Sequence, residues 1–469
     1  MTEAISDLEQ ILALDRAHLI HPITEFRKHE QRGAHIVVGG HGVELTLADG
    51  RTLLDGFSGL FNINVGHGRT EIAEAVAEQM RRVAYYPSFW DFGNEPAVRL
   101  AERVVGLLPA DRGLRHVLFH SSGSEANEAN FRFARLYHAV RGAPTKTKIL
   151  SRRWSYHGAT RGSGSATGIA AYQALLDPDP SHVHIAPPYC YRCEFGETYP
   201  GCKLPCAADL EATLEREGPD SVAAFIAEPV MGTGGILVPP PEYFAEVSEI
   251  CRRHDVLLIL DEVITAFGRT GRWFGMEHWD IHPDLVSLAK GISSGYLPLS
   301  ASVLSDRVYE TLRDRMPAGL PLMFGLTYNN HPACCAAALA NLDIVEGEGL
   351  VENARRVGAY LLERLRKAFG NSPIAGEIRG LGMLAAVEVV RDRDTRLPFP
   401  NVADPAWIAA RAFERGLIVR ALFQCVALAP PLCATTEEID RMVSVLEEVW
   451  TEAEQRFAGA GAGESRGGA

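Results

Sequence analysis

The chain has 469 residues, of which 46% are hydrophobic and 22% charged, with a formal net charge of −13. This length exceeds one ordinary core and predicts two domains, and the composition is that of a folded globular protein. The negative charge argues against a general affinity for nucleic acid or an anionic membrane. The acidic start, MTEAISDLEQ, lacks the basic and apolar stretches of a targeting segment, which predicts a cytoplasmic protein.

Short apolar runs alternate with helical stretches through the middle of the chain. The runs lie at residues 116–120, 223–227, 256–260 and 285–289. Apolar strands with helices between them are typical of a buried, mostly parallel sheet, which binds ligands at the carboxyl ends of its strands. We therefore predict a large α/β domain over residues 76–335.

The pattern changes after residue 335. Helices are predicted at 336–345, 351–369 and 436–457, and strands at 378–390 and 417–428. The last helix begins with a capping sequence, Thr-Thr-Glu-Glu. We predict a smaller α+β domain made of residues 336–457 and the N-terminal segment 1–75, which has strand-like runs at 36–38 and 43–47. The small, polar tail at 458–469 is predicted to be disordered.

Three of the predicted strands end in an ionisable residue: Glu228, Asp261 and Lys290. A charged side chain at the end of a buried strand is costly without a partner, so three at one sheet edge predict one site. Burial of Lys290 would make its neutral amine a nucleophile for a carbonyl, although a single lysine is usually a surface charge. Asp261 could hold a protonated ring nitrogen or, equally well, cap a turn.

A small, Gly-containing turn, SSGSEA at 121–126, follows the run at 116–120 and opens a predicted helix. The free N–H groups of such a turn suit a phosphate. The turn matches neither the P-loop nor the G-x-G-x-x-G pattern. Tyr156 and His157, beside a glycine, could stack on a planar ligand or simply pack in the interior.

Two groups of residues have a spacing that could bind a metal ion. His278 and His282 stand four apart, but Pro283 breaks the helix that such ligation needs, so we predict a loop without a metal. Four cysteines are close in sequence: Cys190, Cys193, Cys202 and Cys206. They could be reduced, form disulfides or bind zinc, and in each case we predict a structural role.

Taken together, these segments resemble the class III (ω-amino acid) aminotransferases of pyridoxal-phosphate fold type I, from about residue 35 to 450. The motifs are SSGSEANEAN (121–130), WSYHGAT (154–160), AEPVMGTGG (227–235), LILDEVITAFGRTG (258–271), SLAKGISSGYLPLS (287–300), LTYNNHP (326–332) and LAPPLCATTEEID (428–440). The segment at 187–202 is most similar to the branch with taurine:pyruvate and ω-amine:pyruvate transaminases. The resemblance implies an α/β fold with a mostly parallel sheet and a small domain built from both termini.

The resemblance also implies a cofactor, pyridoxal 5'-phosphate (PLP), held covalently by Lys290. Asp261 would pair with the pyridinium nitrogen, with Tyr156 on one ring face and Val263 on the other. The phosphate would lie at Ser122, Gly123 and Ser124. Thr327 would reach this phosphate from the other subunit of a homodimer with shared active sites, and a further tetramer is left open. His157 and Glu228 would lie near the cofactor.

Other positions bear on the substrate. Arg420 matches an arginine that binds the substrate carboxylate in amine:pyruvate members, and a surface charge is the alternative reading. Residues that match the aromatic lining of the substrate pocket are Phe61, Phe89, Trp90 and Tyr156. Two positions depart from the family pattern: Ala266 replaces a common glycine, which should be silent, and Leu326 replaces a common aromatic, which should reshape the pocket near the subunit interface.

The reaction implied is a ping-pong transamination from a primary amine or ω-amino acid donor to an α-keto acid, with pyruvate as the expected acceptor. Lys290 would serve as acid and base in both halves. An aminomutase or a decarboxylating transaminase on the same fold is one alternative, and a non-catalytic PLP-binding homologue is another. The sequence does not identify the amine donor.

Overall fold

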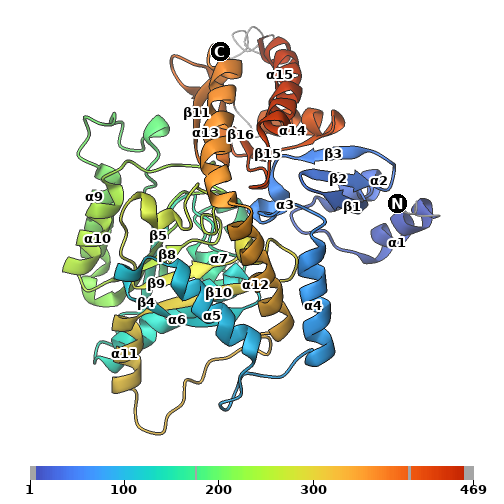
Figure 1. Ribbon diagram of the computed structural model, residues 1–469. Coiled ribbons are helices and arrows are strands. Elements are labelled where there is room, and N and C mark those ends of the chain that lie inside the picture. The colour runs from blue at the N-terminus through green and yellow to red at the C-terminus, as the bar shows by residue number, and fades with distance from the viewer. Residues whose placement is uncertain (1–6, 175–176, 400–402, 459–469) are drawn as a thin grey trace.

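The computed structural model describes residues 7–174, 177–399 and 403–458, so all but the first residue of the predicted tail at 458–469 lies outside it. Figure 1 shows a large sheet wrapped by helices, with a second group of strands and long helices above it. None of the helices in the described ranges is both long and apolar enough to cross a membrane.

A seven-stranded sheet forms the larger part of the molecule, in the order β4-β10-β9-β8-β7-β5-β6. Its strands are β4 (Leu114–His120), β5 (Lys148–Arg152), β6 (His182–Ile185), β7 (Val222–Ala227), β8 (Leu257–Asp261), β9 (Leu285–Leu288) and β10 (Ser300–Ser305). Only β10 runs antiparallel to its neighbours. The prediction of a mostly parallel sheet is therefore confirmed. The sequence analysis missed β5, β6 and β10, because each is short and carries polar residues within its apolar pattern.

Helices cover both faces of this sheet, as the alternation of side chains along each strand requires. One face packs against α6 (Gly123–Val140) and α11 (Asp306–Arg315). The other packs against α5 (Glu95–Leu107), α9 (Pro205–Glu217) and α10 (Tyr243–Arg253). Both layers are built from fully buried strand residues, which explains why these strands appear in the sequence as continuous apolar runs.

A second sheet follows in the C-terminal part, with the order β11-β12-β16-β15. Its strands are β11 (Ala375–Leu381), β12 (Leu384–Asp392), β15 (Arg420–Leu422) and β16 (Cys425–Leu428), with β13 (Leu397–Pro398) paired to β12. The prediction of single strands at 378–390 and 417–428 is wrong. Each stretch folds into a hairpin, since the chain turns at Gly382 (φ +58°) and at Phe423 (φ +53°).

The long helices α13 (Leu350–Phe369) and α14 (Ala403–Glu414) pack on this second sheet, and α15 (Thr436–Ala458) packs against both of these helices. The predicted cap of the last helix is confirmed. The backbone N–H of Glu438 donates to Thr435 Oγ1 (3.2 Å), and the backbone N–H of Thr435 donates to Glu438 Oε2 (2.8 Å). This reciprocal pair explains why the helix begins where it does.

The N-terminal segment forms a small sheet of β1 (Val37–His41), β2 (Glu44–Leu47) and β3 (Thr52–Asp55). A C-terminal strand, β14 (Leu417–Ile418), pairs parallel with β3 and completes it. Segments from the two ends of the chain therefore lie side by side (Figure 1). The exact division of the chain into domains stays a prediction. The remaining elements are α1 (Leu8–His18), α2 (Phe26–Arg32), α3 (Ser58–Phe61), α4 (Thr70–Arg82), α7 (Arg161–Ala166), α8 (Ala170–Gln173), α12 (Pro332–Gly347) and 3₁₀ turns at Ala110–Arg112, Cys190–Arg192, Pro219–Ser221, Gly275–His278 and Lys290–Ile292.

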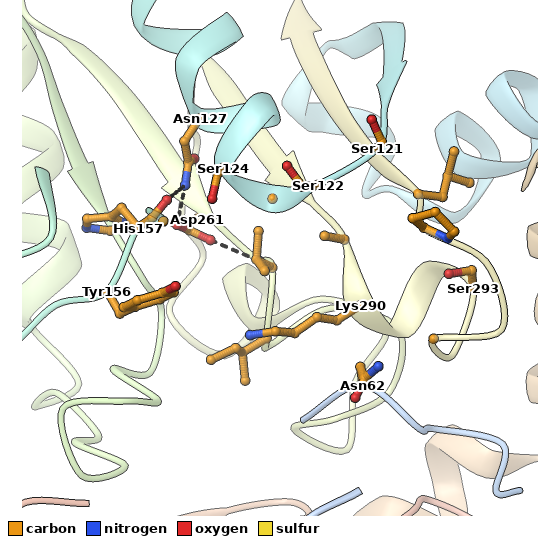
Figure 2. Close-up of a pocket in the computed structure, with 18 of the residues that line it drawn as sticks. Asn62, Ser121, Ser122, Ser124, Asn127, Tyr156, His157, Asp261, Lys290 and Ser293 are labelled. Atoms are coloured by element: carbon orange, nitrogen blue, oxygen red, sulfur yellow. Dashed lines mark hydrogen bonds and ion pairs between the residues drawn. The ribbon is translucent and has the colours of Figure 1, made fainter. Parts of the chain in front are cut away.

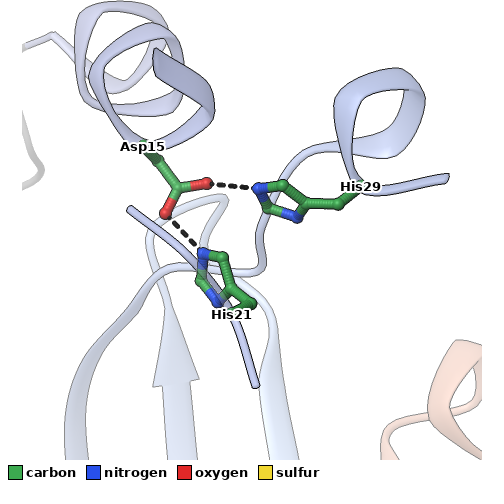
Figure 3. Close-up of side chains that lie close together, drawn as sticks. All are labelled: Asp15, His21 and His29. Carbon is green, nitrogen blue, oxygen red and sulfur yellow. Dashed lines mark hydrogen bonds and ion pairs between the residues drawn. The ribbon is translucent and has the colours of Figure 1, made fainter. Parts of the chain in front are cut away.

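One carboxylate holds the first two helices together. Asp15 on α1 is buried, and its two oxygens face the histidines of the following segment (Figure 3). Its Oδ1 lies 2.8 Å from His21 Nε2, and its Oδ2 lies 3.1 Å from His29 Nε2. The two imidazole rings are in contact, with centroids 4.4 Å apart. We interpret this cluster as a structural clasp between α1 and α2.

Candidate active site

A cavity of about 280 Å³ opens at the carboxyl ends of β7, β8 and β9, next to the start of α6 (Figure 2). Nine of the predicted site residues line it: Ser122, Gly123, Ser124, Tyr156, His157, Glu228, Asp261, Val263 and Lys290. The three ionisable strand ends thus reach one cavity, because β7, β8 and β9 are adjacent and parallel. This arrangement makes the cavity the candidate active site.

Lys290 lies two residues after the end of β9 and begins a 3₁₀ turn. Its backbone is left-handed, with φ +48°, a strained conformation that a non-glycine residue keeps only where its surroundings hold it. The half-buried side chain projects into the cavity (Figure 2). Burial lowers the pKa of its amine to about 8, although the negative charges of Asp261 and Glu228 oppose this shift.

The side chain of Asp261 is held by three donors. Asn127 Nδ2 donates to Asp261 Oδ2 (2.9 Å), and His157 Nδ1 lies 2.8 Å from the same oxygen. The other oxygen, Oδ1, accepts the backbone N–H of Val263 (3.1 Å). Only 4% of Asp261 is exposed, so this support keeps a buried carboxylate in place. Oδ1 retains acceptor capacity for a ligand in the cavity.

The start of α6 supplies backbone N–H groups to the cavity. Ser122 caps the helix through its side chain, which accepts the backbone N–H of Glu125 (3.2 Å). The first N–H groups of a helix have no partner within the helix and favour an anion. A side chain at Gly123 would collide with Val263, since an added Cβ would lie 3.0 Å from Val263 Cγ2. The helix start therefore forms a cradle that fits a phosphate.

Glu228 positions a second part of the cavity wall. Its Oε1 accepts the backbone N–H of Tyr156 (3.2 Å), and its Oε2 accepts the backbone N–H of Gly232 (3.0 Å). Burial raises the pKa of this carboxyl group, while His157 and Arg152 partly oppose the shift. Tyr156 and Val263 both line the cavity, and their roles on the two faces of a ring stay a prediction.

The other predicted residues lie outside this wall in the single chain. Phe61 is nearest, with its ring centroid 5.5 Å from Lys290 Nζ. Arg420 is exposed and lies 6.0 Å from the ring of Phe57, which itself packs on Phe61. Phe89 and Trp90 contact each other at 5.7 Å between ring centroids, and Trp90 is 81% exposed.

Thr327 lies on the surface, where its carbonyl oxygen accepts the hydroxyl of Tyr85 (2.6 Å). It is not among the residues that line the cavity of this chain. Leu326, the neighbour that departs from the family pattern, lies in the same surface segment. The predicted contribution of Thr327 to the site of a partner subunit therefore stays a proposal.

Sequence reasoning missed several polar residues of the site. Asn62, Asn127 and Ser293 line the cavity, and Asn127 bonds directly to Asp261. Asn62 comes from the N-terminal segment, far from the other motifs in sequence, and carried no local signal. Asn127 could have been found, because a polar residue one turn into α6 falls on the face that packs against the sheet.

The two groups with metal-like spacing differ in how the structure arranges them. His278 Nε2 bonds to Thr270 Oγ1 (3.1 Å), whereas His282 is exposed beside Asp111 and Asp280, so the two histidines do not share a site. All four clustered cysteines are free thiols, and burial raises the pKa of Cys190 to about 11 and that of Cys206 to about 12. Within the described ranges, no three of their sulfur atoms lie within 4.8 Å of one another. The structural role of the four cysteines stays a prediction.

The cavity fits a phosphorylated pyridine aldehyde. The Lys290 amine could bind the aldehyde, Asp261 the ring nitrogen and the start of α6 the phosphate, with Tyr156 against the ring. The class III aminotransferase family model matches residues 26–450. Relatives include the diaminobutyrate–2-oxoglutarate transaminase of Halomonas elongata, 42% identical over 94% of this chain and 95% of that protein. The putrescine–pyruvate aminotransferase of Pseudomonas aeruginosa is 37% identical over 92% and 94%, and the taurine–pyruvate aminotransferase of Bilophila wadsworthia 36% over 96% and 99%.

The solved structure of the ω-transaminase from Pseudomonas jessenii in complex with PMP matches with a TM-score of 0.93 and 35% identity, covering 96% of this chain and 99% of that one. The chain belongs to the class III aminotransferase family. It is a PLP-dependent transaminase with the fold of type I PLP enzymes, and the resemblance found in the sequence is confirmed.

Proposed function

We propose that this transaminase moves an amino group from a primary amine or ω-amino acid to pyruvate by a ping-pong mechanism, in which the donor product leaves before the acceptor binds. One observation carries the proposal: Lys290 and Asp261 reach one cavity from adjacent strands, with the lysine amine at a lowered pKa. The putrescine–pyruvate and taurine–pyruvate relatives support the donor class and the acceptor. A cytoplasmic location stays a prediction.

Bound PLP supplies an electron sink that stabilises negative charge on the substrate carbon. Lys290 would hold the cofactor through its neutral amine and would move a proton at Nζ between the substrate carbon and the cofactor. A pKa of about 8 suits both tasks, because the amine is then close to balance between its charged and neutral forms near neutral pH. In the same proposal Asp261 Oδ1 holds the proton of the pyridine nitrogen.

The remaining wall orients the ligand. The N–H groups of Gly123 and Ser124 at the start of α6 bind the phosphate, with the Ser122 cap fixing the turn. Tyr156 and Val263 line the cavity and would cover the two faces of the cofactor ring. His157 acts on the ring through Asp261, to which it bonds. Glu228 orients Tyr156 through its backbone bond.

Substrate recognition is proposed to involve Arg420 and the aromatic side chains near Lys290. Arg420 lies beyond Phe57 and Phe61 and is free to reach a carboxylate, since its side chain is exposed. Trp90 and its half-buried neighbour Phe89, together with Thr327, are proposed to complete the site of a partner subunit in a homodimer. The exposure of Trp90 supports this assignment, because a side chain of this size is usually covered.

A donor screen with the purified holoenzyme tests the proposal. Putrescine, taurine, β-alanine and an arylalkylamine are each offered with pyruvate, and alanine formation is measured beside the visible band of the bound cofactor. We expect alanine with at least one donor. The relative from Halomonas elongata has 2-oxoglutarate in its name, so this keto acid is tested as well. If the enzyme forms glutamate from 2-oxoglutarate and no alanine from pyruvate, the acceptor is 2-oxoglutarate and not pyruvate.

The same screen separates the alternative reactions. An aminomutase would convert its substrate without any keto acid, and a decarboxylating transaminase would release carbon dioxide. Arg420→Ala is the matched variant for the acceptor. It should raise the KM for pyruvate on the order of tenfold or more, since a charge-assisted bidentate contact is lost. An unchanged KM for pyruvate would remove Arg420 from the proposed site.

A further inference from the structure

Behind Asp261, three buried polar side chains form a continuous chain of hydrogen bonds that the proposed mechanism does not use. Asn130 Nδ2 donates to Ser287 Oγ (2.7 Å), and Ser287 Oγ donates to Asn127 Oδ1 (2.6 Å). Asn127 Nδ2 donates to Asp261 Oδ2 (2.9 Å). We propose that Asn130, Ser287 and Asn127 are positioning residues that hold Asp261 in the orientation needed to bind the protonated pyridine nitrogen.

This inference rests on the proposed role of Asp261. The backbone places every member of the chain. Ser287 on β9 is the register partner of Asp261 on β8, and the backbone N–H of Glu262 donates to Ser287 O (2.9 Å). Asn127 and Asn130 lie one turn apart on α6, on the face that covers these strands. All three side chains are at most 1% exposed, so water does not compete for their hydrogen bonds.

The contacts of Asn127 with Asp261 fix which group donates in each of these hydrogen bonds. The Nδ2 end of Asn127 lies 2.9 Å from Asp261 Oδ2 and 2.7 Å from the carbonyl oxygen of His157, and two acceptors require a donor between them. Its Oδ1 therefore faces Ser287, and the single hydroxyl proton of Ser287 must point toward Asn127. Ser287 Oγ is left as an acceptor for Asn130 Nδ2. Every donor thus points toward the carboxylate.

Removing Ser287 would release this constraint. Without the hydroxyl, Asn127 Oδ1 is left buried and unpaired, and rotation of the amide would turn an oxygen toward the carboxylate of Asp261. Because residues that orient a ligand through a second side chain typically change affinity or activity on the order of tenfold, we expect Ser287→Ala to raise the Kd for PLP about tenfold and to lower kcat about tenfold. The KM for the amine donor should stay unchanged.

Ser302 offers a matched control. It is the register partner of Ser287 on β10 and is also fully buried under α6. Its hydroxyl donates to a backbone carbonyl, Ala126 O (3.0 Å), and lies 3.2 Å from His120 Nε2, without contact to Asn127. Ser302→Ala therefore costs a comparable buried hydrogen bond but leaves the support of Asp261 intact.

The experiment compares Ser287→Ala, Ser302→Ala and Asp261→Asn in three measurements on the full chain: the Kd of the apoprotein for PLP, the pH midpoint of the visible band of the bound cofactor, and kcat with KM. We expect Ser287→Ala to raise the Kd and displace the midpoint, while Ser302→Ala matches the wild type in both. The proposed positioning of Asp261 is wrong if Ser287→Ala and Ser302→Ala behave alike in these measurements. Near-wild-type behaviour of Asp261→Asn would instead contradict the proposed role of Asp261 itself.

Two further variants keep the proposal testable if Ser287→Ala fails to fold. Asn130→Ala removes only the outermost donor and should change the Kd in the same direction by a smaller factor. In a double-mutant cycle, Asn127→Ala combined with Ser287→Ala should be no worse than Asn127→Ala alone, because both act through the same contact. If the effects of Asn127→Ala and Ser287→Ala on the Kd were additive, the proposed positioning of Asp261 through this contact would be wrong.

Discussion

Two buried carboxylates of this molecule lie in different surroundings. Asp261 in the cavity is held by Asn127, His157 and a backbone N–H, and no arginine or lysine bonds to it in the described residues. Glu388 on β12 is buried just as completely, but Arg192 Nε lies 2.5 Å from its Oε1 and Arg379 Nη1 2.6 Å from its Oε2.

The pKa of Glu388 reflects this difference. Burial alone would raise it, but Arg379, Tyr189 and Arg192 outweigh burial and hold the pKa below its ordinary value. Arg379 also donates to Gly235 O (2.7 Å) and so ties β11 to the loop that follows β7. Removing one partner from a buried, paired charge destabilises the fold, because the charge that remains loses its compensation. A buried carboxylate that has no arginine or lysine partner and faces a cavity remains available to a cationic ring.

The largest effect should come from the cavity. Lys290→Ala removes both the attachment of the cofactor and the proton carrier, so we expect turnover to fall by about 10⁴-fold or more with the fold unchanged. Lys148→Ala is the control, because Lys148 pairs with Glu217 away from the cavity. Steady-state rates and circular dichroism of both variants measure the result. Turnover of Lys290→Ala near the wild-type rate would contradict the mechanism.

The other carboxylate should respond in stability and not in chemistry. Glu388→Gln leaves the buried Arg379 and the half-buried Arg192 with reduced compensation, so we expect the free energy of unfolding to fall by about 3–5 kcal/mol with kcat close to that of the wild type. Glu377→Gln is a milder control, since Glu377 is 35% exposed and contacts the same Arg379. Urea unfolding followed by fluorescence gives both values. If Glu388→Gln kept its stability but lost turnover, Glu388 would act in the reaction and the contrast with Asp261 would be wrong.

The lowered pKa of Lys290 predicts a pH dependence. Since the amine must be neutral to react, the rate at which the apoprotein takes up PLP should rise about tenfold per pH unit and level off above pH 8. The unfolded lysine has a higher pKa than the folded one, so the apoprotein should also gain stability between pH 8 and pH 10.5 and show no such gain below pH 8. Stopped-flow absorbance and thermal unfolding measure the two effects. A rate that keeps rising to pH 10 would refute the shift.

The smallest effect is expected at the clasp of the N-terminal helices. Asp15→Asn weakens the contacts to His21 and His29 and should cost about 1 kcal/mol of local stability. Amide hydrogen exchange of α1 and α2 should accelerate while that of β8 and β9 stays unchanged. Equal acceleration in β8 and β9 would mean that the clasp supports the whole fold.

The sequence predicted the parts of the site that lie at strand ends. Asp261 and Lys290 stand out because a charge follows an apolar run, and the start of α6 follows a strand directly. Ser287 could not be predicted in this way, because a single serine within an apolar strand resembles a small core residue. Its importance comes from the register of β8 against β9 and from the helix above, and neither is encoded locally. The hairpin turns at Gly382 and Phe423 were missed because apolar residues continue on both sides.

The parallel pairing of β3 with β14 has a consequence for biosynthesis. β3 leaves the ribosome early, yet its partner strand is made only after the whole seven-stranded sheet. The large sheet can therefore assemble before the N-terminal sheet is complete, and we expect Phe61 and Asn62, which follow β3, to reach their places beside the cavity only afterwards. A nascent chain halted before β14 would contain Lys290 and Asp261 but not the complete pocket. We therefore expect the chain to retain the cofactor only after β14 has been synthesised.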